Sequence, residues 1–149
     1  MNDDSEILLK MIEREEALVR HYEDQRATVT NFVLVATSLV IGFLTQKGVV
    51  LASLPAALLL VLLGVYGAIT VTKLYERTQF ASAFIKQYIN QINERYPQLL
   101  LTQIKDKVRT EHKAKFPRSS MLHMHQLWSL LHIIIAFLGC CLVVAILIS

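Results

Sequence analysis

Apolar residues gather into three long runs along the chain, and none of these runs contains Asp, Glu, Lys or Arg. The runs extend over residues 29–44, 51–72 and 127–148. An α-helix needs about 20 apolar residues to cross a hydrocarbon core of ~30 Å. The second and third runs reach that length alone, and the first reaches it by borrowing small neighbours. The pattern predicts three transmembrane helices, and a helix buried in a soluble core is the alternative for each run.

The first two spans are each predicted to be part of a longer helix. No Pro interrupts residues 7–45, and apolar positions before the span follow one face of a helix. The second helix is predicted to begin at Pro55, which suits a first helical turn, and to end at Tyr96, because a residue before Pro disfavours helical angles. A shorter amphipathic helix is predicted at residues 98–113, and its apolar face consists of Leu100, Leu101, Ile104 and Val108.

Apolar helix faces outside the lipid must be buried against something. The helices at 7–28, 73–96 and 98–113 are expected to pack together as a small cytoplasmic bundle. Alternatively, the apolar stripe along the helix at 73–96 packs against neighbouring subunits. The aromatic part of that stripe is broad for so small a bundle, which favours self-association. It consists of Phe80, Phe84 and Tyr88.

Small residues recur within the spans, where they let helix backbones approach closely. They are Gly64, Gly67 and Ala68 in the second span and Ala136 and Cys140 in the third. Contacts between helices of one subunit and contacts between subunits are equally compatible with this pattern.

The basic residues orient the chain, because Lys and Arg near span ends collect on the cytoplasmic side. Fourteen of the 15 lie before the first span or between the second and third, and only Lys47 lies in the short turn. The predicted organisation is a cytoplasmic helix (1–28), a span (29–45), a second span (51–72), a basic cytoplasmic region (73–126) and a third span (127–148). The C-terminus is then outside.

Part of the basic region forms a dense cluster just before the third span. It consists of Lys105, Lys107, Arg109, Lys113, Lys115 and Arg118. Each basic residue near an anionic membrane surface contributes about 1 kcal/mol of attraction. The cluster is therefore interpreted as binding anionic lipid headgroups rather than nucleic acid.

No catalytic or metal site stands out, so we expect no enzyme activity and no cofactor. Three histidines, His123, His125 and His132, lie at or in the third span. His125 or His132 could ligate a haem in a small haem- or quinone-binding anchor subunit, although the first two spans offer no second His. Alternatively, His123 and His125 are expected at the lipid headgroups, together with Trp128. Arg118 and His123, with four residues between them, resemble the motif of HEPN-type ribonucleases, whose cation and base would act on a phosphodiester.

The stretch from Leu18 to Asn93 resembles small prokaryotic membrane proteins found with anti-phage systems. The likeness lies in the segments HYEDQR (21–26), NF (31–32) and KLYER (73–77) around two spans joined by a very short turn. Similar proteins are two-span effectors of the SLATT type and octameric accessory membrane proteins of type VI CRISPR systems. The resemblance implies oligomeric assembly and depolarisation or permeabilisation of the membrane. The third span departs from the two-span pattern.

We therefore predict an all-α protein of the bacterial inner membrane that assembles as a homo-oligomer. The spans lack the ionisable residues of a proton-coupled transporter, whereas a pore can be lined by small, hydroxyl or apolar residues. The predicted function is a pore-forming or membrane-perturbing effector gated through its cytoplasmic helices, which a partner protein or ligand would activate. A haem- or quinone-binding anchor and a scaffold without flux or chemistry are the alternatives.

Overall fold

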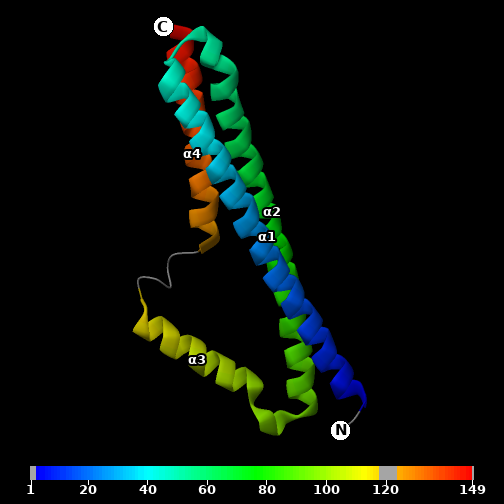
Figure 1. Ribbon diagram of the computed structural model, residues 1–149. Helices are drawn as coiled ribbons and strands as arrows, with labels where there is room; N and C mark the ends of the chain where they lie inside the picture. Colours follow the sequence, from blue (N-terminus) through cyan, green and yellow to red (C-terminus); the bar gives the residue numbers. More distant parts are fainter. Residues whose placement is uncertain (1–2, 118–123, 149) are drawn as a thin grey trace. The chain divides into compact units, whose positions relative to one another are not determined.

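The computed structural model describes residues 3–117 and 124–148, and these are helical with short connections. The elements in order are α1 (Asp3–Lys47), the 3-10 turn η1 (Leu51–Ser53), α2 (Leu54–Arg95), the 3-10 turn η2 (Pro97–Leu99), α3 (Leu101–Lys115) and α4 (Met124–Ile148) (Figure 1). No strand occurs in the described residues, so the all-α prediction is confirmed. The sequence also predicts Ser119 or Ser120 as the N-cap of the third long helix, and both lie outside the described residues.

The turn between α1 and α2 is compact because its backbone groups are bonded locally. Gly48 has a φ of 79°, in the left-handed region that glycine adopts without strain. Its N–H donates to the carbonyl of Leu44 at 2.9 Å. The Ser53 hydroxyl donates to the carbonyl of Gly48 at 2.9 Å, and α2 then begins with Pro55 in its first turn.

The connection between α2 and α3 differs slightly from the predicted one. As expected, α2 ends just before Tyr96-Pro97. Residues 97–99 form η2, and Leu100 then adopts a φ of 48°, in the left-handed region. A non-glycine residue in that conformation breaks the helical path. The amphipathic helix therefore begins at Leu101 instead of residue 98.

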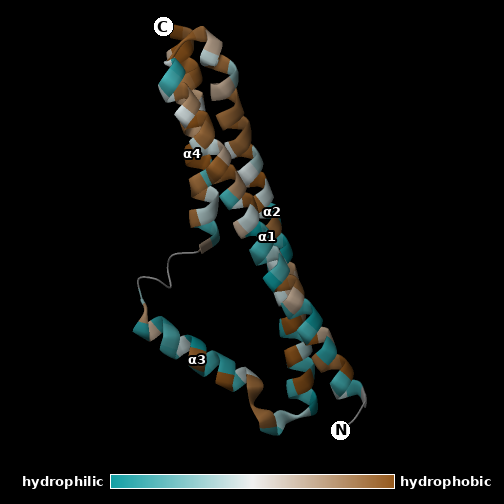
Figure 2. Cartoon of the chain, in the orientation of Figure 1, coloured by the Kyte–Doolittle hydropathy of each residue, from teal (hydrophilic) through white to brown (hydrophobic). Residues whose placement is uncertain are grey.

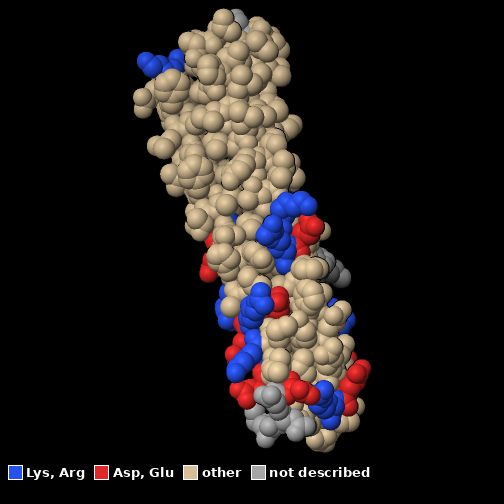
Figure 3. All heavy atoms as spheres, turned by 90° about the vertical axis from the view of Figure 1, so that its right-hand side faces the viewer, with Lys and Arg blue, Asp and Glu red and all other residues tan. Residues whose placement is uncertain are grey.

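The chain divides into two compact units, and α1 and α2 each contribute to both. The apolar unit comprises residues 24–75 and 124–149, and the polar unit comprises residues 1–23 and 76–123. Figure 2 shows mainly hydrophobic residues along α4 and along the parts of α1 and α2 that belong to the apolar unit. Figure 3 shows an extended stretch of surface without acidic or basic atoms on the face it displays.

Three helices in the described residues are long and apolar enough to cross a membrane. They are Asp4–Lys47, Leu51–Arg95 and Met124–Ile148. Their inward-facing side chains in the apolar unit include Val33, Leu60 and Ile135, which are 0%, 0% and 5% exposed. Most of the other large side chains of this unit face outward, as expected for helices whose surrounding solvent is lipid.

The polar unit is a hairpin of α1 and α2 rather than a closed three-helix bundle. Its buried residues include Ala81 and Ile92 of α2, at 3% and 8% exposure. No residue of α3 is buried, and Ile104 and Val108 are 56% and 59% exposed. The expectation that α3 buries its apolar face in the bundle is therefore wrong for the single chain. The face offers little area, because charged residues occupy seven of the 15 positions of this short helix.

Candidate functional site

Two glycines of α2 form a close seam with α4 in the apolar unit. A Cβ added to Gly64 would lie 2.7 Å from the Cα of Ala136, and one added to Gly67 would collide with the His132 ring. Real Cβ atoms do not approach backbone atoms this closely, so both positions require glycine in this packing. Gly64, Gly67 and Ala136 thus make contacts between helices within the single chain.

The other small residues predicted for helix packing contribute less to this seam. Ala68 is half-buried, and Cys140 is exposed on α4. Gly139, which the sequence pattern did not single out, is buried instead. A Cβ there would lie 2.7 Å from the backbone nitrogen of Val61 and 3.0 Å from the Cβ of Leu60. The sequence signal that could have identified Gly139 is its spacing, because it follows Ala136 by three residues and so lies on the same helix face.

A buried polar pair lies beside the seam. His132 is fully buried and Thr30 is 2% exposed. Nε2 of His132 and the hydroxyl of Thr30 share a hydrogen bond of 3.2 Å. Nδ1 of His132 has no hydrogen-bond partner in the described residues and lies against Gly67. The pair thus connects α4 to α1 through one polar contact between buried side chains.

These contacts leave little freedom for haem ligation. Nε2 of His132 is hydrogen-bonded to the Thr30 hydroxyl, and Nδ1 lies against Gly67. Both nitrogen-bearing edges of the ring are therefore occupied. An iron at either nitrogen would require the ring to turn out of the seam. His125 stacks on Tyr75 with ring centroids 4.1 Å apart and planes 12° apart. His123 lies outside the described residues.

Aromatic and basic side chains meet near one end of the charge-free segments of the apolar unit. The Arg26 guanidinium lies over the Trp128 ring, with Cζ 5.3 Å from the ring centroid. An open groove of about 340 Å³ runs beside them, between α1 and α4. Trp is enriched at the border between hydrocarbon and water, so this cluster is expected at that border.

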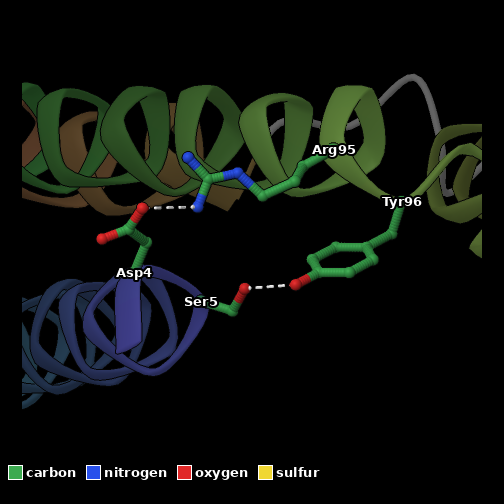
Figure 4. A network of polar contacts seen from close by, with 4 residues as sticks. All are labelled: Asp4, Ser5, Arg95 and Tyr96. Carbon is green, nitrogen blue, oxygen red and sulfur yellow. Dashed lines mark hydrogen bonds and ion pairs between the residues drawn. The ribbon is translucent and has the colours of Figure 1, made fainter. Parts of the chain in front are cut away.

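Two polar contacts join the segments of the chain that start α1 and end α2 in the polar unit. The hydroxyls of Ser5 and Tyr96 share a hydrogen bond of 2.7 Å, and Nη1 of Arg95 lies 3.2 Å from Oδ2 of Asp4 (Figure 4). Ser5 and Tyr96 also line an apolar groove of about 640 Å³.

The aromatic stripe of the polar unit is continuous along α2. The Phe80 and Phe84 rings meet edge to face with centroids 4.9 Å apart, and the Phe84 and Tyr88 centroids are 6.1 Å apart. Phe80 is 67% exposed, whereas Phe84 and Tyr88 are half-buried. The chain itself therefore leaves part of this stripe uncovered.

The basic cluster predicted to bind anionic lipid lies on α3. Lys105, Lys107, Arg109, Lys113 and Lys115 are all exposed, and Arg118 lies outside the described residues. The described residues contain no group of three or more His, Cys, Asp or Glu side chains that could hold a metal ion.

Comparisons with protein-family models, with curated proteins and with solved structures give no match to this chain. The fold defines a class, namely an all-helical protein whose described residues include three helices long and apolar enough to cross a membrane. Its likeness to anti-phage membrane proteins stays a prediction.

Proposed function

We propose that this chain assembles as a homo-oligomer in the membrane and forms a pore or permeable defect that the polar unit controls. The observation that carries the proposal is a polar stripe on α1. Asn31, Ser38 and Thr45 follow one another at intervals of seven residues, or two helical turns, and all three are exposed in the single chain. The packed positions Val33 and Leu44 lie on another side of the helix.

A polar stripe that faces hydrocarbon is unfavourable, and it is stabilised when it faces other helices or water. The hydroxyls of Ser38 and Thr45 donate to carbonyls of their own helix, those of Leu34 and Gly42, at 2.9 and 2.8 Å. The Asn31 amide has no such local bond among those of the described residues. In a ring of subunits, the stripes would surround a common axis and offer hydroxyl and amide groups to ions or water.

Self-association is supported by the polar unit, where apolar side chains remain uncovered. Phe80, Ile7 and Val108 are 67%, 53% and 59% exposed. If these residues lie in water, contact with other subunits would bury them. Helices α1 and α2 continue without interruption from the polar unit into the apolar unit. A change in the contacts between polar units would therefore act on the same helices that carry the stripe.

Ion flux in liposomes tests the proposal. Ser38→Leu should strongly reduce the flux of the reconstituted protein, because it places an apolar side chain on the stripe. Thr72→Leu is the matched control: its hydroxyl also donates to the carbonyl four residues earlier, at 2.7 Å, but it lies on α2. A bilayer that stays impermeable with the unmodified protein under all activating conditions would reject the pore. Co-purification of an unrelated protein in stoichiometric amount, together with an absence of ion flux, would support the scaffold instead.

A further inference from the structure

The groove between α1 and α4 in the apolar unit has the lining of a lipid site. Its walls include Leu34, Leu127 and Leu131, and its polar lining residues are Thr30 and Asn31. Trp128 also lines it and lies under the Arg26 guanidinium. A long apolar wall with polar groups at neighbouring helical positions suits an amphiphile rather than a small ion.

Arg26 has hydrogen-bonding capacity that the chain does not use. Its Nε is buried and has no hydrogen-bond partner in the described residues. Its contact with Trp128 is a cation–π contact, with Cζ 5.3 Å from the ring centroid. A guanidinium has five N–H donors, so Arg26 can bind an oxygen anion through its N–H groups while it keeps this contact.

The sequence places this cation at the edge of the first charge-free segment. Arg26 is the last charged residue before Lys47. A phosphate group that sits at the border of the hydrocarbon would meet Arg26, and an acyl chain that runs inward would meet the leucines of the groove. A zwitterionic headgroup carries its own cation, so one additional Arg favours a headgroup with net negative charge.

We propose that the groove binds one anionic phospholipid, with the phosphate held by Arg26 and an acyl chain along Leu34, Leu127 and Leu131. This site is separate from the basic cluster on α3, and it does not depend on whether the protein conducts ions. It gives the apolar unit a bound lipid that contacts both α1 and α4.

Trp128 is the only tryptophan of the chain, so its fluorescence reports on the groove directly. The full-length protein is reconstituted into phosphatidylcholine vesicles that contain small amounts of phosphatidylglycerol or phosphatidylcholine brominated on the acyl chains. Bromine quenches tryptophan fluorescence on contact. Half-maximal quenching is expected at an about five-fold lower mole fraction of the anionic lipid, the preference that one basic residue near the surface provides.

Arg26→Gln should bring the two lipids to equal quenching, and Arg26→Lys should keep part of the preference. Arg20→Gln is the matched control, because it removes one charge from the same helix at an exposed side chain beside Glu16; it should behave as the unmodified protein does. Continued quenching by brominated phosphatidylcholine shows that each variant is still inserted.

Equal quenching by both lipids in the unmodified protein, or an undiminished preference in Arg26→Gln, would overturn the lipid site and leave the pore proposal standing. Absence of quenching by either lipid would place Trp128 outside the bilayer and overturn both. A lipid preference without ion flux under any activating condition would separate the two in the opposite sense, because the lipid site would stand and the pore proposal would fail.

Discussion

The apolar unit and the polar unit share α1 and α2, but different contacts hold them together. In the apolar unit, glycines bring backbones together, and Gly64 and Gly139 leave no space for a Cβ. In the polar unit, the contacts are larger apolar side chains such as Ile92 and, near the ends of the helices, the pair of Ser5 and Tyr96.

The difference follows from the solvent that each unit is expected to meet. Lipid is as apolar as a leucine side chain, so helices in lipid associate through close packing and a few hydrogen bonds instead of the hydrophobic effect. In water, burial of large apolar side chains stabilises a helix pair directly. Helix α2 accordingly carries Gly64 and Gly67 where it meets α4 in the apolar unit, and Ile92 among the buried residues of the polar unit.

The largest effect is expected from a methyl group in the seam. Gly64→Ala should lower the free energy of unfolding in detergent by about 1–3 kcal/mol, the usual cost of overpacking, because the new Cβ would meet backbone atoms of Ala136. Gly42→Ala is the control, since nothing lies within 4 Å of its added Cβ; its stability should be unchanged or slightly raised. Equal effects of the two substitutions would show that the seam is not tightly packed.

The contact between Ser5 and Tyr96 should have a local effect in the polar unit. Tyr96→Phe removes a part-buried hydrogen bond of 2.7 Å, which contributes about 1 kcal/mol. Hydrogen exchange in the first turns of α1 should then be about five-fold faster. Tyr66→Phe, at a 55% exposed position of the apolar unit, should leave this exchange unchanged. If exchange at the start of α1 does not respond to Tyr96→Phe, the contact does not hold the helices together.

A smaller effect is expected from the buried polar pair. Thr30→Val should cost about 0.6 kcal/mol of unfolding free energy, the average for hydrogen bonds between membrane helices, since it leaves His132 Nε2 without its partner. Thr72→Val removes an exposed hydroxyl that is bonded within α2 and should cost less. If Thr30→Val instead raises the unfolding free energy, the hydrogen bond does not stabilise the fold and His132 stabilises it only through its packing.

The smallest effect is expected at the ion pair of Asp4 and Arg95. Their side chains are 69% and 44% exposed, and exposed pairs contribute at most about 1 kcal/mol before salt screens them. Asp4→Asn should therefore change exchange in α1 less than Tyr96→Phe does, and the difference should vanish in high salt. A larger, salt-resistant effect would give the ion pair a greater role than the hydrogen bond.

The long helices could be predicted from the sequence because their signals are local. Residues 7–45 lack proline, Pro55 begins a helix and Pro97 ends one, and each of these rules concerns neighbouring residues only. The structure accordingly has α1 and α2 as two long helices, with Gly48 in the turn between them. The glycines of α2 were also visible, since small residues in a span indicate close packing.

The partners of these residues could not be predicted, because they depend on contacts between distant segments. The sequence placed His132 in a span but gave no reason to pair it with Thr30, 102 positions away. It also suggested that α3 packs in a bundle, because periodicity shows that a helix has an apolar face but not what covers it. In the single chain that face is exposed.

The seam between α2 and α4 also has a consequence for biosynthesis. Gly64 and Gly67 leave the ribosome well before Ala136 and His132, which follow much later in the chain. If the three apolar helices cross a membrane, as we propose, the hairpin of α1 and α2 would be inserted while Gly64 and Gly67 still lack their partners on α4. Packing of α4 against these glycines would then replace contacts with lipid, and this exchange would be a late step of folding.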